Sequence, residues 1–122
     1  YHELLELFLA WTPVVDGKLI PMQPIDAFQQ GRMARIPTIV GEVENEGIMF
    51  IWGASPKPLG KLKMNLMMDA ILGVERSNKI REKYPEPKDA SDYRPYLSRL
   101  ATLYIFHCPN RNVSRAIEQQ QS

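Results

Sequence analysis

The stretch from Trp11 to Trp52 reads WTPVVDGKLIPMQPIDAFQQGRMARIPTIVGEVENEGIMFIW, and it decides the fold that we expect. Within it, the segment from Ile36 to Val43 begins with apolar and β-branched residues, which favours a buried strand. A polar turn at Asn45-Glu46-Gly47 follows, and then the apolar residues of a helix start. Open α/β sheets bind ligands beyond the carboxyl ends of their strands, so this order places the carboxylate of Glu46 where chemistry could use it.

The residues before this strand predict short elements separated by turns. Glu3 to Ala10 is expected to be a short helical or irregular entry. The dipeptide Asp16-Gly17 suits a type I′ turn between two extended arms, because both of its residues tolerate positive φ. Pro24 can open a helix over residues 25–30, and Gly31 is placed to cap that helix in the left-handed conformation.

The middle of the chain predicts a helix followed by a loop. Leucines and methionines keep helical spacing from Leu59 up to Gly73, after a start marked by prolines. We expect Met64, Met67 and Met68 to fill the core, since thioethers fit irregular gaps, although they could also line an apolar pocket. The sequence YPEPKDA, residues 84–90, predicts a charged, proline-rich loop.

A long helix is expected at the end of the chain. Ser91 or Asp92 can cap it, and it would run from about Tyr93 towards Gln119. Pro109 lies deep inside this range and removes the hydrogen bond to the carbonyl four residues earlier. We therefore expect a kink of the helix near Ile105.

The order and spacing of several short motifs resemble a known family. The motifs are Pro13-Val14-Val15-Asp16-Gly17, Pro21, Gly31, Ile36-Pro37, Gly41, Asn45-Glu46-Gly47 and Phe50. They are similar to the middle of type-B carboxylesterases, the cholinesterase-like branch of the α/β-hydrolases. A second match, Phe106 to Arg111, resembles the Cys-Pro pair on a long helix of the same family. Residues 53–92 carry no such signature.

The resemblance implies an α/β fold that is incomplete on its own, with one or two sheet strands and several helices. The 122 residues contain no Gly-x-Ser-x-Gly nucleophile elbow. In α/β-hydrolases the triad follows the chain order Ser, acid, His. We therefore expect residues 1–122 to be an internal fragment of a carboxylesterase domain, with the serine upstream and the histidine downstream. The chain alone is expected to be inactive.

The resemblance implies that Glu46 is the acid of a catalytic triad. Such an acid accepts a hydrogen bond from the histidine, fixes its tautomer and stabilises the imidazolium that forms during the reaction. A solvated turn glutamate beside a helix start is the alternative. Glu42 and Glu44 compete with Glu46, because strand alternation places all three on one side. The family motif favours Glu46, which directly precedes glycine.

The histidines do not offer a second catalytic site. His107 follows the candidate acid, as a catalytic histidine would, but it precedes Cys108-Pro109 within an apolar helix, so we expect a structural role. His2 carries no signal. With two histidines and one cysteine far apart, no metal-ligand spacing is present, and no cofactor is expected.

Two features bear on the cellular compartment. Cys108 is the only cysteine, so it is either an inert thiol or, as the resemblance implies, half of a disulfide with a cysteine beyond Ser122. Asn112-Val113-Ser114 is a glycosylation sequon. A disulfide and a sequon would both fit a protein of the secretory pathway.

Composition narrows the range of partners. The chain carries 15 basic and 14 acidic residues, a net charge of +1, which argues against a nucleic-acid surface. No apolar run reaches membrane-spanning length. The expected partners are the remainder of the same hydrolase domain and a small ester substrate.

Three function classes follow from these features. The first is a serine carboxylic ester hydrolase to which this segment supplies the triad acid. The second is a non-catalytic relative, such as the neuroligins or glutactin. The third is an independent small domain of unknown role.

Overall fold

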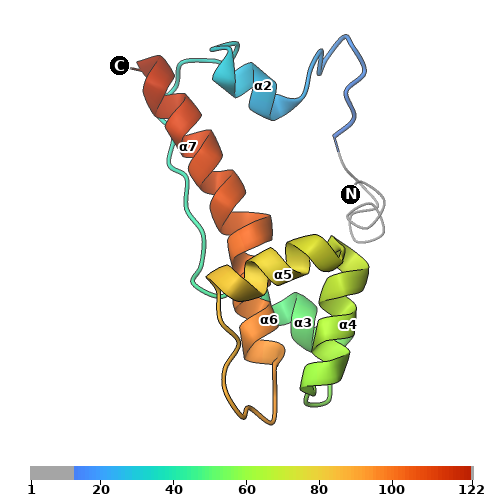
Figure 1. Ribbon diagram of the computed structural model, residues 1–122. Helices are drawn as coiled ribbons and strands as arrows, with labels where there is room; N and C mark the ends of the chain where they lie inside the picture. The colour runs from blue at the N-terminus through green and yellow to red at the C-terminus, as the bar shows by residue number, and fades with distance from the viewer. Residues whose placement is uncertain (1–12, 122) are drawn as a thin grey trace. The chain divides into compact units, whose positions relative to one another are not determined.

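The computed structural model describes residues 13–121, which form helices and loops without a strand in this range. The helical entry expected at residues 3–10 lies outside the described residues. The chain divides into two compact units, one comprising the residues up to Gly41 together with those from Pro109 onward, the other comprising Glu42 to Cys108. Each unit is described by itself (Figure 1).

The strand expected at Ile36 to Val43 is a wrong prediction for this structure. Residues 34–43 are irregular, and no other described segment forms a ladder with them. Ile39 is fully exposed. A strand exists only where its backbone groups pair with a neighbour, and the described part of the chain supplies no such neighbour. The segment therefore has the apolar composition of a buried strand but is not part of a sheet in this structure.

The first unit contains helix α2, Pro24–Gln29, and the part of helix α7, Cys108–Gln121, from Pro109 onward. The expected cap is confirmed, since Gly31 has φ +67°. Gln120 Nε2 donates to the carbonyl oxygen of Gln29 at 3.4 Å. The positive φ favours glycine at this position, whereas a Cβ there would meet only the flexible end of the Gln120 side chain, which could shift.

The turn at Asp16-Gly17 differs from the type I′ turn that we expected. Gly17 has φ +75°, but Asp16 is not in the positive-φ region, which a type I′ turn requires of both residues. Asp16 Oδ1 instead accepts hydrogen bonds from the backbone N–H groups of Lys18, Leu19 and Ile20, each at 2.9 Å. These hydrogen bonds lower the pKa of Asp16, that from Ile20 most. Its side chain, rather than a strand pair, thus shapes this turn.

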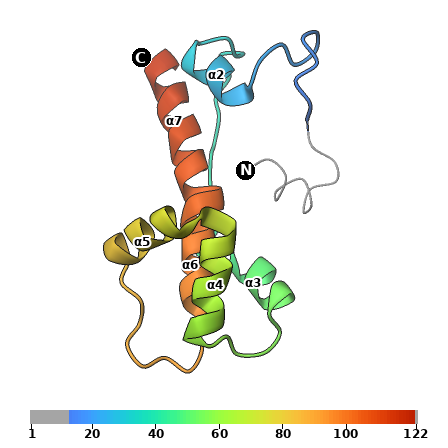
Figure 2. The same cartoon turned by 45° about the vertical axis from the view of Figure 1, so that its right-hand side comes forward.

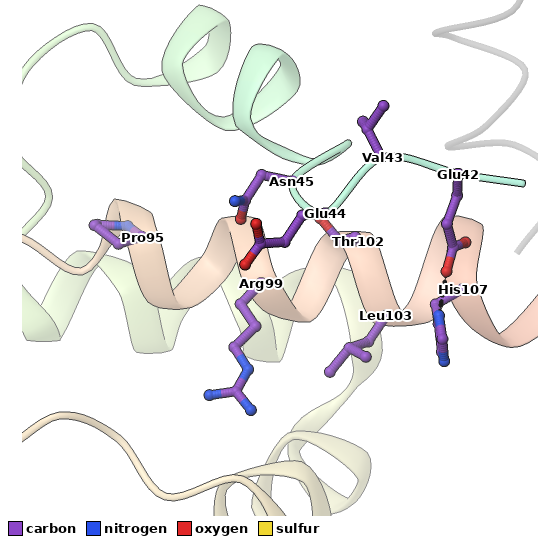
Figure 3. A pocket seen from close by; sticks show the side chains of 9 residues that line it. All are labelled: Glu42, Val43, Glu44, Asn45, Pro95, Arg99, Thr102, Leu103 and His107. Carbon is purple, nitrogen blue, oxygen red and sulfur yellow. Dashed lines mark hydrogen bonds and ion pairs between the residues drawn. The ribbon is translucent and has the colours of Figure 1, made fainter.

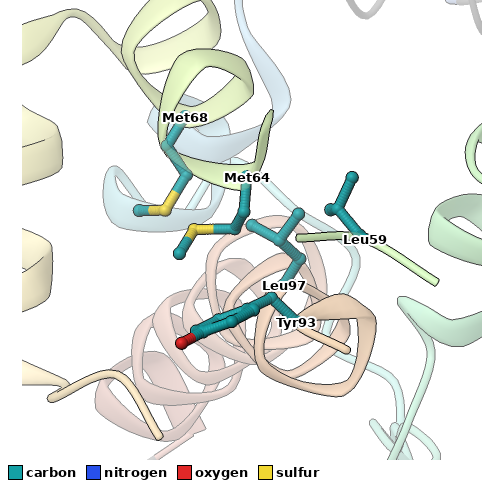
Figure 4. Packing of buried hydrophobic residues seen from close by; sticks show 5 residues of the cluster. All are labelled: Leu59, Met64, Met68, Tyr93 and Leu97. Atoms are coloured by element: carbon teal, nitrogen blue, oxygen red, sulfur yellow. The ribbon is translucent and has the colours of Figure 1, made fainter. Parts of the chain in front are cut away.

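The second unit is built from five helical segments. They are α3 Ile48–Ala54, α4 Lys61–Leu72, α5 Val74–Lys83, α6 Arg94–Ala101 and the π-helix η1 Thr102–His107. Helix α3 packs against α6, and α4 against α5 (Figures 1 and 2). The core consists of Leu59, Met64, Met68, Tyr93 and Leu97 (Figure 4). The interpretation of the methionines as core residues is confirmed for Met64 and Met68.

Helix α5 was not expected from the sequence. Helix α4 ends at Leu72 with Gly73, φ +80°, as its C-cap, in agreement with the spacing that ends there, and α5 begins directly after it. Arg81 of α5 reaches back to α4, where it donates to Asn65 Oδ1 at 3.0 Å and to Asp69 Oδ1 at 2.9 Å. A helix that packs through polar groups carries little apolar periodicity, which is why the pattern of its sequence did not indicate it.

Near Ile105, where we expected a kink, the structure instead has the π-helix η1. Pro109 has no N–H to offer the Ile105 carbonyl, so the α-helical ladder cannot continue across it. The N–H of Cys108 donates to Leu103 O, five residues earlier, which is the wider hydrogen-bonding step of a π-helix. The long C-terminal helix is therefore α6, η1 and α7 in succession.

Asp92 and Arg94 join the start of α6 to the loop that follows α3. The Arg94 guanidinium binds both carboxylate oxygens of Asp92 and the carbonyl oxygens of Ser55 and Pro56. It also lies 4.9 Å from the ring centre of Trp52, which gives that aromatic residue a packing role. The N-cap of α6 is Tyr93, without a side-chain cap hydrogen bond, rather than the expected Ser91 or Asp92. Asp92, one residue before it, accepts at Oδ1 from the N–H of Arg94 at 3.0 Å.

The ion pair of Asp92 and Arg94 should make the stability of the fold depend on pH. Arg94 holds the pKa of the Asp92 carboxyl far below its usual range. A lowered folded-state pKa stabilises the fold above the ordinary pKa of about 4, and this stabilisation is lost as the pH falls toward the folded-state value. In the full-length protein, wild type should melt above Asp92→Asn at pH 6, and the gap should narrow below about pH 4.

Thermal melts at several pH values check this expectation, with Asp89→Asn as the matched control. Asp89 is exposed and has φ +53°, a conformation that asparagine also tolerates, so its substitution should leave the melting curve nearly unchanged. A gap between wild type and Asp92→Asn that stays constant down to pH 3 would contradict the assigned role.

Candidate functional site

The turn of residues 44–47 carries Glu46, the candidate catalytic acid. Glu46 is partly buried, and its Oε1 accepts a hydrogen bond from the backbone N–H of Val43 at 3.2 Å. The carboxylate therefore folds back over its own turn. The residues form a turn rather than the end of a strand, so strand alternation does not govern where the three acids of this segment point.

Gly47 fastens this turn to the helix beneath it. Its N–H donates to the hydroxyl oxygen of Thr102 at 2.9 Å, a buried contact between residues 55 positions apart in the chain. The Thr102 hydroxyl in turn donates to the carbonyl oxygen of Ser98 at 2.9 Å. A Cβ at Gly47 would lie 2.4 Å from that same carbonyl oxygen, so only glycine lets the turn approach α6 this closely.

An open groove of about 770 Å³ runs beside this turn within the second unit (Figure 3). One wall is the segment from Glu42 to Asn45, and the other is the face of α6 and η1 that bears Arg99 and His107. The lining residues are Glu42, Val43, Glu44, Asn45, Pro95, Arg99, Thr102, Leu103 and His107. Two of the three competing acids thus line the groove, and Glu46 is not among the lining residues.

Glu42 and His107 form a carboxylate–imidazole pair at one end of the groove. Glu42 Oε1 contacts His107 Nδ1, as Figure 3 shows, and both side chains remain partly exposed. His107 was expected to have a structural role, and the structure shows that its partner is Glu42, which the sequence did not indicate. The two residues are 65 positions apart, and nothing local in the sequence indicates that they meet.

The groove does not assemble a complete nucleophilic site. Its lining includes neither serine nor cysteine. Thr102 carries the only aliphatic hydroxyl there, and that hydroxyl is already donated to Ser98 while its oxygen accepts from Gly47. A hydrolytic triad needs an accessible nucleophile within reach of a histidine base, and the described residues of this groove do not provide one.

The two residues that bear on the compartment both lie on α7. Cys108 is exposed, and its thiol has no second cysteine within the 122 residues. Asn112 is exposed, whereas Ser114 of the same sequon donates its hydroxyl to Asn110 O at 2.8 Å. The disulfide, the glycosylation and the secretory assignment stay predictions.

Residues 13–121 show neither a membrane span nor a metal cluster. Within them, no helix has the length and apolar character that crossing a bilayer requires. No three side chains of His, Cys, Asp or Glu in the same residues are grouped to hold a metal ion.

Comparisons with curated proteins identify three relatives. Crystal protein of Dictyostelium discoideum is 35% identical over 121 residues, which cover 98% of this chain and 22% of that protein. The cAMP-regulated D2 protein of the same organism is 38% identical over 109 residues, 89% of this chain and 20% of that protein. Lipase 2 of Geotrichum candidum is 43% identical over 47 residues, 38% of this chain and 8% of that protein. No solved structure matches significantly.

The same comparisons settle the family and the extent of the match. The chain spans about a fifth of the length of the two Dictyostelium proteins. The sequence profile described as "Carboxylesterase family" matches residues 2–122, nearly the whole sequence. The resemblance found in the motifs around Glu46 is therefore confirmed, and this chain belongs to the carboxylesterase family, a family of α/β-hydrolases.

Proposed function

We propose that this chain is the segment of a serine carboxylic ester hydrolase that supplies the triad acid, Glu46. The observation that carries the proposal is the family match over residues 2–122, together with the place of Glu46 directly before a glycine in a turn. The close packing of Gly47 against the helix supports the proposal, because a catalytic acid needs a backbone held in one position.

The chemistry would be acyl transfer without a cofactor. A serine attacks the ester carbonyl while a histidine takes its proton, and the acyl-enzyme is then hydrolysed by water. Glu46 would accept the hydrogen bond from the far imidazole nitrogen and stabilise the imidazolium. In the present structure its carboxylate accepts from Val43 N–H at 3.2 Å, a long contact that an imidazole N–H could supplement at the second oxygen.

The remainder of the hydrolase domain is the partner that this function requires. Since the chain spans about a fifth of its relatives, the serine and the histidine would come from elsewhere in the protein. The exposed apolar residues of the segment 36–43 support this, because a strand there would bury them in a sheet. The exposed apolar side chains are Ile36, Ile39, Val40 and Val43.

A non-catalytic role is the second candidate. Two of the relatives are called Crystal protein and cAMP-regulated D2 protein, names that state no enzymatic activity, whereas the third is called a lipase. Since the acid alone cannot separate the two roles, the serine decides between them.

Labelling with a fluorophosphonate, which reacts with an activated serine, tests the proposed function. The full-length protein should be labelled at one serine and should hydrolyse p-nitrophenyl acetate with saturation, and the label should abolish that activity. The isolated 122-residue chain is the control and should neither label nor turn over the ester. Absence of both signals from folded full-length protein would favour the non-catalytic role, and labelling of the isolated chain would overturn the segment assignment.

A further inference from the structure

We propose that Thr102 is a positioning residue for Glu46, holding the acid-bearing turn in place through its hydroxyl. This inference rests on the proposed function of Glu46. It concerns a residue that belongs to none of the motifs singled out in the sequence, and that lies on the π-helix η1, whereas the acid lies in the turn of residues 44–47.

The hydrogen bonds of Thr102 are directional and buried. Its hydroxyl proton is committed to Ser98 O at 2.9 Å, so the hydroxyl oxygen presents a lone pair to Gly47 N–H, also at 2.9 Å. Thr102 is 6% exposed, and both hydrogen bonds are buried. Removing the hydroxyl would take away the acceptor of the Gly47 N–H, and an unsatisfied buried donor costs free energy that a movement of the turn would relieve.

The contact sits one peptide from the acid. Gly47 follows Glu46 directly, so any shift of the Gly47 N–H is transmitted to the Glu46 backbone. The helix already lies close to Gly47 on one side. A Cβ built on Gly47 would meet Ser98 O at 2.4 Å, Ala101 Cβ at 3.0 Å and Thr102 N at 3.1 Å, so the turn has more room to move away from the helix than toward it. Loss of the hydroxyl should therefore displace the carboxylate outward.

The other contacts of this segment do not replace the Thr102 bond. The Glu42–His107 pair lies at the start of the segment and is partly exposed, so it constrains the acid weakly. Phe50 stacks on Phe106 with ring centres 5.9 Å apart, one helical turn after the acid. Thr102 makes the buried polar contact nearest to Glu46, and the geometry assigns the positioning role to it.

Thr102→Val is the decisive variant, because valine keeps the shape of threonine and lacks its hydroxyl. In the full-length protein we expect kcat to fall between about tenfold and a hundredfold, the order of effect of a misplacement near 1 Å. KM should stay within about twofold, since neither Thr102 nor the acid binds substrate. Thr102→Ser restores the hydroxyl and should return kcat to within about threefold of wild type. Ser91→Ala, which removes the hydroxyl of an exposed loop residue, is the matched control.

The pH dependence of kcat/KM separates a positioning role from a purely structural one, because a general loss of stability would not shift this profile. A carboxylate that touches the catalytic imidazole favours its charged form and raises its pKa. If Thr102→Val moves Glu46 away, the acidic limb of the kcat/KM profile should shift to lower pH. The Thr102→Ser profile should coincide with that of wild type.

The comparison with Glu46→Gln separates this inference from the proposed function. Full activity of Glu46→Gln would refute the catalytic acid and the positioning role together. If Glu46→Gln is inactive but Thr102→Val has wild-type kcat, or loses folded protein without loss of kcat per folded molecule, the positioning role alone is refuted. An equal loss from Thr102→Val in the Glu46→Gln background would also refute it, because Thr102 would then act independently of the acid. If Thr102→Val does not fold, Thr102→Ala takes its place in the same comparisons.

Discussion

Glu46→Gln in the full-length protein is expected to lower kcat by about ten-thousandfold, by analogy with asparagine at the triad acid of serine proteases. Glutamine keeps the length of the side chain but removes the charge that stabilises the imidazolium, and its amide can present a donor where an acceptor is needed. KM should change much less, because the acid does not touch the substrate. Steady-state hydrolysis of p-nitrophenyl acetate measures both constants.

Glu44→Gln is the matched control for this substitution. Glu44 lies in the same turn and lines the groove, so it reports on any general effect of removing a charge there. Its kcat should remain within a few-fold of wild type, since exposed carboxylates contribute little. Glu42→Gln, which breaks the pair with His107, should behave in the same way. Full activity of Glu46→Gln with loss of activity in either control would mean that the acid has been misassigned.

The second large effect concerns the 122-residue chain expressed by itself. It should unfold over a broad temperature range and bind a hydrophobic dye, because large apolar side chains are exposed in both of its units. The segment 36–43 exposes apolar side chains and forms no ladder with another described segment, so it can act as a template for association between chains. Calorimetry and light scattering measure these properties. A sharp, cooperative transition of a monomer would instead favour an independent domain.

Substitution of Ile39 by lysine tests whether the isolated chain aggregates because segment 36–43 lacks the sheet that we expect in the full-length protein. Ile39 is 100% exposed in the isolated chain, so Ile39→Lys should reduce aggregation there. In the full-length protein the same substitution should lower the melting temperature strongly, because a buried, unpaired charge is costly. Ser91→Lys, at an exposed loop position, is the control and should be neutral in both settings. A neutral Ile39→Lys in the full-length protein would show that this segment is not buried in a sheet.

Local residue chemistry correctly predicted several elements of the structure. Helix α2 begins at Pro24 and is followed by Gly31, as expected. Proline lacks the N–H that the first helical residue does not need, and glycine tolerates the positive φ after the helix end. Asp92, one residue before the N-cap, accepts from the first N–H of α6, and the regular α-helix is interrupted four residues before Pro109, as a π-helix rather than the expected kink. Each of these effects acts within a few residues of its cause, so sequence alone suffices to predict it.

The sequence also determined the family, because the ordered motifs around Glu46 extend over a long stretch and the family profile matches residues 2–122. The tertiary structure decided what depends on contacts between distant residues. The segment 36–43 has the composition of a strand, yet a strand requires a partner that the described residues do not supply. The bond between Gly47 and Thr102 and the pair of Glu42 with His107 join residues 55 and 65 positions apart. No local propensity encodes such contacts, because they arise only when the acid-bearing turn packs on the helix.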